Sequence, residues 1–512
     1  MSRSKKSLKN ILYAFTGQFF GLIISFFSRI VFINILGSEY LGLNGLFSNI
    51  LMVLALAELG VGEAITYSLY KPLAEKNEKK CISLMQLYKR FYTFIGIIIL
   101  VLGLCILPFL PYFINDIPEI SNINYIYILF LINTSISYFF SYKRNLIIAD
   151  QRRYIATFYR YLFYFILNIS QIIFLIITHN YILFLIIQII CTLLENIFVS
   201  FKANRLYPFL LKKDKVLLDE ESKKSIIKNI RAMMMHKVGS VIVNSTDNII
   251  LSKYVGLNAV GLYSNYYLIT NSLNVIFSQL YNSIRASVGN LCVDDDKEKQ
   301  YKVFEKIYFI SFWLYSFSSI CLICLLNDFI KIWIGKEYIL NFSIVLIIVL
   351  NFYVYGMRKV TLVFKEAYGL FYNDRWKPVF EAVINLISSI ILANYLGILG
   401  VFLGTLISSI SVCLWVEPYV LFKYGFKKKV YMYFKDYIKY SFIFLTSGFF
   451  TYFICSYIDG NLYIIFLIKI VLCLTIPNLI VFLLFHKNEY YIYYIDLMKS
   501  IIKKIIKRNV KV

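Results

Sequence analysis

Charged and polar side chains interrupt the apolar runs of this chain at helical spacing. A charge at the centre of a membrane span costs ~2.5–3.5 kcal/mol on insertion scales, so such residues normally face a cavity or a partner. The basic residues of this kind are Arg29, Lys237 and Arg285. The polar and acidic ones are Gln18, Ser25, Ser28, Glu58, Glu63, His236, Ser240, Asn244, Asp247, Asn274, Ser278 and Asn282.

These residues recur at steps of three or four, so they form stripes along a few helices. The simplest joint interpretation is that the stripes line one water-filled cavity. The alternative is that they pair with each other, for example Arg29 with Glu58 or Lys237 with Asp247, and only hold helices together. A third hypothesis is that Glu58, Glu63, His236 and Asp247 exchange protons and couple transport to a proton gradient.

We expect the other charged residues in or near the apolar runs to have structural roles. Glu195, Glu381 and Glu417 lie near span ends, and we expect them to be solvated. Lys469 is expected to anchor to lipid or to pair between helices. The tetrapeptide "CLIC" (321–324) has metal or redox spacing but no second cysteine pair nearby, so its cysteines are interpreted as small buried hydrophobes.

The apolar runs themselves predict the elements that hold these residues. Hydrophobic residues make up 59% of the 512, and the mean hydropathy is +0.68. A span needs ~20 apolar residues, and about fourteen such runs can be counted. They are 11–36, 43–69, 91–114, 123–148, 155–178, 181–201, 230–254, 260–290, 305–334, 339–364, 379–396, 398–422, 437–457 and 462–485. The sequence therefore predicts an all-α polytopic membrane protein.

The net charge of +24 would favour nucleic-acid binding in a soluble protein, but its distribution argues against that. Most of the 53 lysines and arginines fall in alternate loops, and within spans the count finds only Arg29, Lys237, Arg285 and Lys469. This positive-inside pattern predicts that both termini are cytoplasmic.

Two halves of the chain repeat each other. "ILGSEYLGL" (35–43) matches "YVGLNAVGL" (254–262), so that Gly37 corresponds to Gly256 and Gly42 to Gly261. Six spans separate the copies, which predicts parallel repeats, a transporter architecture. The predicted organisation is a six-helix bundle (1–205), a cytoplasmic linker (206–228), a second six-helix bundle (229–425), two further spans (426–485) and a tail (486–512).

The tail carries isoleucines on one helical face and lysines on the other. This pattern predicts an amphipathic helix on an anionic inner leaflet. The alternative is a disordered basic tail.

Two stretches resemble a known family. "SRIVFINILGSEYLGLNGLFSNILMVLALAELGVGEAITYSLYKPLAE" (28–75) resembles the amino-terminal region of bacterial Wzx-type polysaccharide flippases, and "TDNIILSKYVGLNAVGLYSNYYLI" (246–269) resembles the start of their second bundle. The superfamily, MOP, also includes the MATE exporters and the lipid II flippase. The resemblance implies two six-helix bundles in a V around a basic cavity.

The resemblance also implies a function. Such proteins, in the bacterial plasma membrane, move undecaprenyl-diphosphate-linked oligosaccharide repeat units to the outer leaflet by alternating access, for capsule, exopolysaccharide or O-antigen. Arg29, Lys237 and Arg285 would then meet the diphosphate, and the remaining stripe residues would meet sugars or couple ions. No cofactor is implied beyond proton or sodium coupling. The implied partners are membrane lipid, a polysaccharide polymerase and a chain-length regulator.

Two other functions stay open. A MATE-type exporter would share the fold and differ in cargo, and the near balance of deep charges does not decide between them. A membrane polymerase or glycosyltransferase is less favoured, because the outer loops are short and no nucleotide-binding motif is present.

Overall fold

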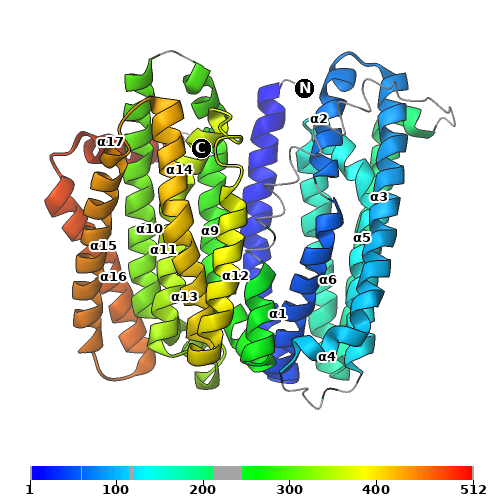
Figure 1. Cartoon of the computed structure of the whole chain (residues 1–512), viewed down its shortest axis with the longest axis horizontal. Coiled ribbons are helices and arrows are strands. Elements are labelled where there is room, and N and C mark those ends of the chain that lie inside the picture. The colour runs from blue at the N-terminus through cyan, green and yellow to red at the C-terminus, as the bar shows by residue number, and fades with distance from the viewer. Residues whose placement is uncertain are drawn as a thin grey trace. The chain divides into compact units, whose positions relative to one another are not determined.

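A computed structural model describes residues 3–58, 60–115, 120, 122–211, 241, 245–293 and 296–509. These residues form helices joined by short turns, with no β-strand among them, so the predicted all-α class is confirmed (Figure 1). They group into two compact units, residues 1–264 and 265–512. The predicted linker at 206–228 and bundle start at 229 stay predictions, because 212–240 lie outside the described residues.

Unit 1 consists of long helices packed side by side. The closest pairs are α1 with α6, α5 with α7, and α3 with α5. Its elements are α1 (Arg3–Leu54), η1 (Ala55–Glu58), α2 (Val61–Ala74), α3 (Glu78–Ile106), η2 (Leu107–Phe109), α4 (Leu110–Phe113), α5 (Ile123–Ala149), α6 (Arg153–Thr178), α7 (Tyr181–Leu206), η3 (Pro208–Leu211), the helical residues 245–254 and the start of α9 (Leu257–Val293).

The first two predicted spans are joined more tightly than expected. No loop separates 11–36 from 43–69, because α1 continues through a single bend at Gly37, whose φ is 82°. The second run is itself broken, since the 3₁₀ turn η1 and left-handed Gly60 (φ 78°) interrupt it before α2. Glycine adopts this conformation without the steric cost that a Cβ brings.

Unit 2 contains the rest of α9 and the later helices. Here α12 packs on α13, and α10 packs on α11, α15 and α16. The elements are α10 (Lys297–Trp333), η4 (Lys336–Tyr338), α11 (Phe342–Ala367), α12 (Lys377–Leu396), α13 (Ile398–Ser408), η5 (Ser409–Cys413), α14 (Leu414–Val420), η6 (Leu421–Phe426), α15 (Tyr431–Ser456), α16 (Leu462–Phe485) and α17 (Glu489–Asn509). The turns η5 and η6 are π-helical, so the run 398–426 is a single irregular helix.

Ten helices of the described residues are long and apolar enough to cross a membrane, or eleven if the bent α5 is one span. Three of the fourteen predicted spans are not among these helices. Run 43–69 is broken, 230–254 is described only at 241 and 245–254, and 260–290 forms the more polar α9. The count of fourteen is therefore not confirmed.

Loops predicted to share a membrane side meet at one end of unit 1. The Asn10 side chain donates to the Gln151 carbonyl (3.3 Å) and accepts from the Tyr154 backbone N–H (2.6 Å). The Tyr207 hydroxyl donates to Asp150 (2.8 Å). Burial and this hydrogen bond raise the pKa of the Tyr207 phenol.

The loops predicted to lie on the opposite side also meet each other in unit 1. The Ser252 hydroxyl donates to the Phe113 carbonyl at 2.8 Å, and the rings of Tyr40 and Tyr181 lie 4.9 Å apart. The alternation inferred from the charges is therefore consistent with the packing of this unit.

Unit 2 shows the same alternation. At one end Lys428 pairs with Glu298 at 2.6 Å. At the other, the Tyr266 hydroxyl donates to Asn327 (2.6 Å) and accepts from the Leu340 backbone N–H (2.8 Å).

The two copies of the glycine motif meet within residues 1–264. A Cβ on Gly42 would lie 2.1 Å from the Leu257 carbonyl oxygen, and a Cβ on Gly261 would lie 2.1 Å from the Ser38 carbonyl oxygen. Ser38 and Leu257 occupy the same position in the two copies, so the contact is two-fold related. Only glycine allows two helices to approach this closely. We call this contact the glycine crossing.

Many large hydrophobic side chains point outward from the predicted spans. On α6, Ile166, Ile169, Ile173 and Ile177 are all exposed at steps of three or four residues. Apolar stripes of this extent are rare on soluble proteins and indicate contact with lipid.

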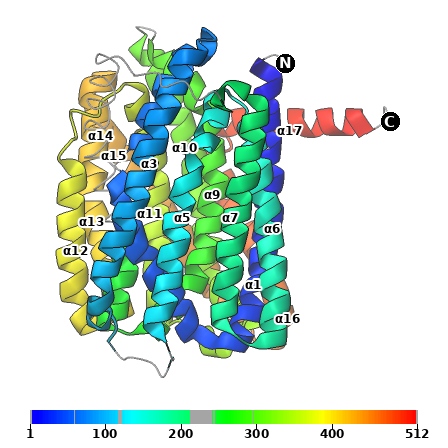
Figure 2. The ribbon, with the colours of Figure 1, turned by 90° about the vertical axis from the view of Figure 1, so that its right-hand side faces the viewer.

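The tail forms the predicted helix. Helix α17 runs across the direction of the other unit 2 helices (Figure 2) and is tied to α10, where Tyr490 donates to Glu305 at 3.0 Å. This orientation is the one that an interfacial amphipathic helix adopts. Residues 489–509 are helical, and the predicted contact of this helix with the inner leaflet stays a prediction.

Candidate functional site

Arg29 is the predicted basic residue that the structure places most clearly. It lies in α1, about 12 Å along the helix axis from the bend at Gly37, and its side chain is only partly buried. Its Nη1 donates to the Ser264 hydroxyl at 3.0 Å, and that hydroxyl donates to the Gly261 carbonyl at 2.8 Å. Arg29 therefore bonds to the start of α9 rather than to Glu58, so the predicted Arg29–Glu58 pair is not formed.

Gln18 lies about three turns before Arg29, at the contact between α1 and α6. Its Oε1 accepts from the Tyr161 hydroxyl at 2.8 Å. Gly17 and Gly21 flank it, and a Cβ on either would approach the Tyr161 ring at 2.1 and 3.2 Å. A small-xxx-small pair is a common means of close helix packing in membranes. Gln18 thus has a packing role here, and its predicted contact with cargo stays a prediction.

The two serines between Gln18 and Arg29 are half-buried on α1. The Ser25 hydroxyl donates to the Leu22 carbonyl at 2.8 Å, which satisfies it within its own helix. Ser28 precedes Arg29 on the same turn, and the cargo contacts of both serines stay predictions.

Glu58 lies among tyrosines at the end of η1. Its carboxylate accepts from Tyr92 (2.8 Å) and Tyr138 (3.5 Å). Tyr92 in turn accepts from Asn145 at 3.4 Å, so the network joins η1 to α3 and α5. Glu58 is half-buried. The described donors to Glu58 are neutral hydroxyls, and the proton hypothesis for Glu58 stays a prediction.

Part of the predicted site lies outside the described residues or side chains. His236, Lys237, Ser240 and Asn244 belong to the undescribed segment, and for Glu63 only the backbone of α2 is described. Asp247 lies in the helical residues 245–254 and is half-buried. The predicted Lys237–Asp247 pair is therefore untested.

The polar stripe of α9 belongs to unit 2. Asn274 and Ser278 are half-buried, whereas Asn282 is exposed. The Asn274 Oδ1 is buried without a hydrogen-bond partner. Arg285 pairs with Glu366 of α11 at 2.9 Å, and the two side chains are 55% and 35% accessible. An exposed ion pair of this kind contributes little to stability, and the predicted contact of Arg285 with a diphosphate stays a prediction.

The predicted site residues therefore fall into two groups that the structure describes separately. Arg29, Gln18, Ser25, Ser28 and Glu58 are in unit 1, and the α9 stripe with Arg285 is in unit 2. That all of them line one cavity stays a prediction.

Sequence reasoning missed a buried ion network in unit 2. The Arg358 guanidinium donates to both Glu417 oxygens (2.9 and 2.7 Å), and Lys377 pairs with Glu417 (2.7 Å) and Glu381 (2.8 Å). Glu417 is fully buried, and the other three are 8–12% exposed. Two positive and two negative charges balance, so the network ties α11, α12 and α14 together at no net charge.

This network corrects two expectations. Glu381 and Glu417 are not solvated, because the ends of α12 and α14 face Arg358 rather than water. Arg358 is a further basic residue inside a predicted span, and the charge count had placed it with the loop. Both Arg358 and Glu417 lie inside the predicted apolar runs 339–364 and 398–422, so opposite charges in two runs were a usable signal.

Two more ion pairs join neighbouring helices. The sequence had predicted a different environment for one of them and had left two roles open for the other. Glu195 was expected to be solvated, but it accepts from Arg144 of α5 at 2.5 Å and is 19% exposed. Lys469 pairs with Asp328 of α10 at 2.7 Å. Of its two predicted roles, pairing between helices is confirmed.

The chain was compared with known proteins. No family model matches the sequence, and no curated protein sequence matches it. Solved structures do match the fold. The lipid II flippase MurJ, in an inward closed conformation, aligns with a TM-score of 0.64 and 19% identity, over 95% of this chain and 100% of MurJ.

Two multidrug transporters align over less of the chain. An inward-facing MATE family transporter of the MOP superfamily gives a TM-score of 0.61 at 14% identity, over 78% of this chain and 94% of its own. The MATE transporter VcmN of Vibrio cholerae gives 0.57 at 13% identity, over 84% and 99%. The chain therefore has the fold of the MurJ and MATE transporters.

Proposed function

We propose that this protein is a flippase that carries undecaprenyl-diphosphate-linked oligosaccharide repeat units from the inner to the outer leaflet of a bacterial plasma membrane, with both termini in the cytoplasm. The observation that carries the proposal is the extent of the fold. The lipid II flippase matches 95% of the chain, while the two MATE transporters leave 16–22% of it unmatched. That remainder is about the size of the segment with α15, α16 and α17.

The residues support an anionic cargo with many hydroxyl groups. Among the described residues the Arg29 guanidinium donates to the Ser264 hydroxyl, and guanidinium groups suit phosphate oxygens. Arg285 and the amides of α9 would add a second cation and hydrogen bonds to sugars. The isoprenoid tail would stay in lipid, beside the exposed apolar stripes. Movement would follow alternating access, as in other repeat-built transporters.

The proposed role is transport rather than catalysis, in capsule, exopolysaccharide or O-antigen synthesis. A polymerase and a chain-length regulator would act on the flipped unit. Coupling to protons or sodium would use the carboxylates, with Glu58 as the described candidate because neutral hydroxyls surround it.

The test is a deletion of the gene in its host, followed by mass spectrometry of lipid-linked sugars. We expect diphosphate-linked repeat units to accumulate and surface polymer to be lost, and wild type to reverse both. Arg29→Ala should fail to rescue. Arg205→Ala, the same change at an exposed position in α7, should rescue. Unchanged lipid-linked sugars in the deletion strain would refute the proposal.

A multidrug exporter is the second candidate, and the MATE neighbours favour it. In that case the deletion strain would keep its polymer and become sensitive to cationic drugs. Glu58→Gln would then abolish drug resistance, whereas Arg29→Ala would leave it largely intact.

A further inference from the structure

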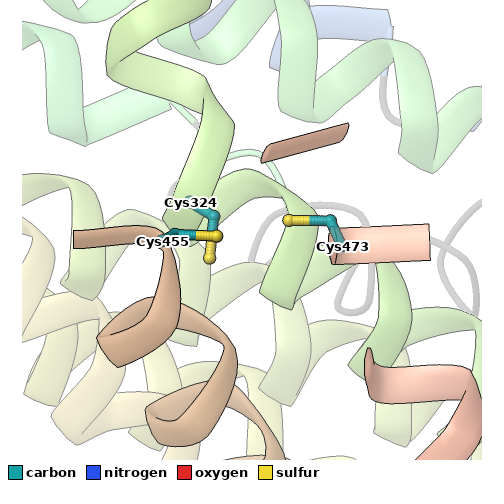
Figure 3. A group of neighbouring side chains, drawn as sticks. All are labelled: Cys324, Cys455 and Cys473. Carbon is teal, nitrogen blue, oxygen red and sulfur yellow. The ribbon is translucent and has the colours of Figure 1, made fainter. Parts of the chain in front are cut away.

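Three buried cysteines from three helices meet in unit 2 (Figure 3). Cys324 is on α10, Cys455 on α15 and Cys473 on α16. Their sulfur atoms all lie within 4.8 Å of one another. Cys473 has no accessible surface, and the other two are at most 7% exposed.

The cluster gives the "CLIC" motif the partners that the sequence did not reveal. Cys321 and Cys324 lie one turn apart on α10, and Cys321 is also within hydrogen-bond reach of Cys473. The second pair of thiols comes from two helices more than 100 residues later in the chain. Cys324 is therefore not a lone buried thiol, because thiols from two other helices lie beside it.

We propose that Cys324, Cys455 and Cys473 form a binding site for a soft, thiophilic metal ion, and that monovalent copper is the ion that fits it best. Thiolates ~2.3 Å from a metal in one plane would lie about 4.0 Å apart. The observed sulfur spacing is within 4.8 Å, so small rotations of the thiols would close the site. Soft thiolate ligands select Cu(I), zinc or iron–sulfur clusters.

The number of ligands separates copper from zinc. Structural zinc sites almost always have four ligands. The described group whose ligand atoms all lie within 4.8 Å of one another contains three cysteines, and Cys321, although beside Cys473, is not a member of it. The nearest carboxylate in sequence on α10, Asp328, is one turn from Cys324 and already pairs with Lys469 at 2.7 Å. A three-coordinate sulfur site suits Cu(I).

Metal binding would also affect how the three helices are held together. Ligand thiols lose their protons when a metal binds. Binding would then join α15 and α16 to α10 through a metal as well as through packing.

The experiment uses the full-length protein in detergent, purified anaerobically with reductant. Cys105→Ser is the background, because Cys105 is the exposed cysteine. Cu(I) is titrated against a chromogenic copper chelator. We expect one Cu(I) per chain, with at least about 100-fold weaker binding in Cys455→Ser and in Cys473→Ser. Cys191→Ser removes a buried cysteine of unit 1 as the matched control, and it should bind like the background.

A second measurement does not depend on the folding of any variant in which a cysteine of the cluster is replaced. X-ray absorption of the copper-loaded background protein should report three sulfur ligands. Equal binding by Cys455→Ser, no binding by the background protein, or a shell of nitrogen and oxygen ligands would each overturn the proposal. A disulfide between any two of the three cysteines, found by non-reducing mass spectrometry of the isolated protein, would also overturn it.

Discussion

Replacing Gly42 with alanine should force the glycine crossing apart. The new Cβ would lie 2.1 Å from the Leu257 carbonyl oxygen, whereas ordinary contact begins at 3.4 Å. The obstacle is backbone, which cannot rotate away as a side chain can. The two helices must therefore separate by about 1 Å, and overpacking of this kind typically costs about 1–3 kcal/mol.

The repeat provides an internal check on this prediction. Gly261→Ala meets the Ser38 carbonyl at the same 2.1 Å, so its cost should match that of Gly42→Ala. Either substitution moves the two helices apart, and that separation also makes room for the second substitution. The double variant should therefore lose less stability than the sum of the single variants, by about 0.5–3 kcal/mol of coupling.

The assay is denaturant unfolding of the purified protein in detergent, with the apparent free energy of unfolding compared across variants. Gly289→Ala is the matched control, because this glycine of α9 has no atom within 4 Å of its would-be Cβ. Alanine is the better helix former by roughly 1 kcal/mol, so Gly289→Ala should be neutral or stabilising. Wild-type stability in Gly42→Ala, or equal losses in Gly42→Ala and Gly289→Ala, would refute the reasoning.

Three further predictions concern side chains. Glu417→Gln leaves one buried positive charge without a balancing carboxylate and should cost about 3–5 kcal/mol of unfolding free energy, whereas Glu298→Gln, at a 71% exposed carboxylate, should cost less than about 1 kcal/mol; equal losses in detergent melts would contradict this. Removing Lys469 or Asp328 alone (Lys469→Met, Asp328→Asn) should destabilise more than removing both, as a double-mutant cycle would show, and purely additive losses would count against the pair. Tyr161→Phe deletes one interhelical hydrogen bond to α1 and should cost about 0.5–1.5 kcal/mol; a loss of protein from the membrane would indicate a larger role.

The fold was largely predictable because it follows from local composition. Apolar runs marked most helices, and charge alternation marked which loops share an end. The motif repeat was predictive as well, since Gly37 and Gly256 both adopt positive φ (82° and 112°). The positions of the helix breaks were not predictable, because the turn at Gly60 depends on how the following helix packs.

The candidate site was less predictable because it depends on which helix faces which. Spacing placed Gln18 and Arg29 on one helix, but it could not show that Gln18 faces α6 while Arg29 reaches Ser264. Likewise, nothing in the local sequence of Cys455 or Cys473 marks it as a neighbour of the other. Such pairings are set by tertiary packing, which hydrophobic periodicity and composition do not predict.

The glycine crossing also bears on the origin of the chain. Position 42 touches position 257, and position 261 touches position 38, so each copy of the motif uses the same residues on the other. In an oligomer this would be an isologous interface, the self-complementary contact of a two-fold homodimer. The crossing has the geometry expected if two copies of a shorter subunit, paired about a two-fold axis, were joined by gene duplication and fusion. Replacing one glycine would separate the two helices and so remove the steric constraint on the other. The two positions should therefore change together among relatives of this protein.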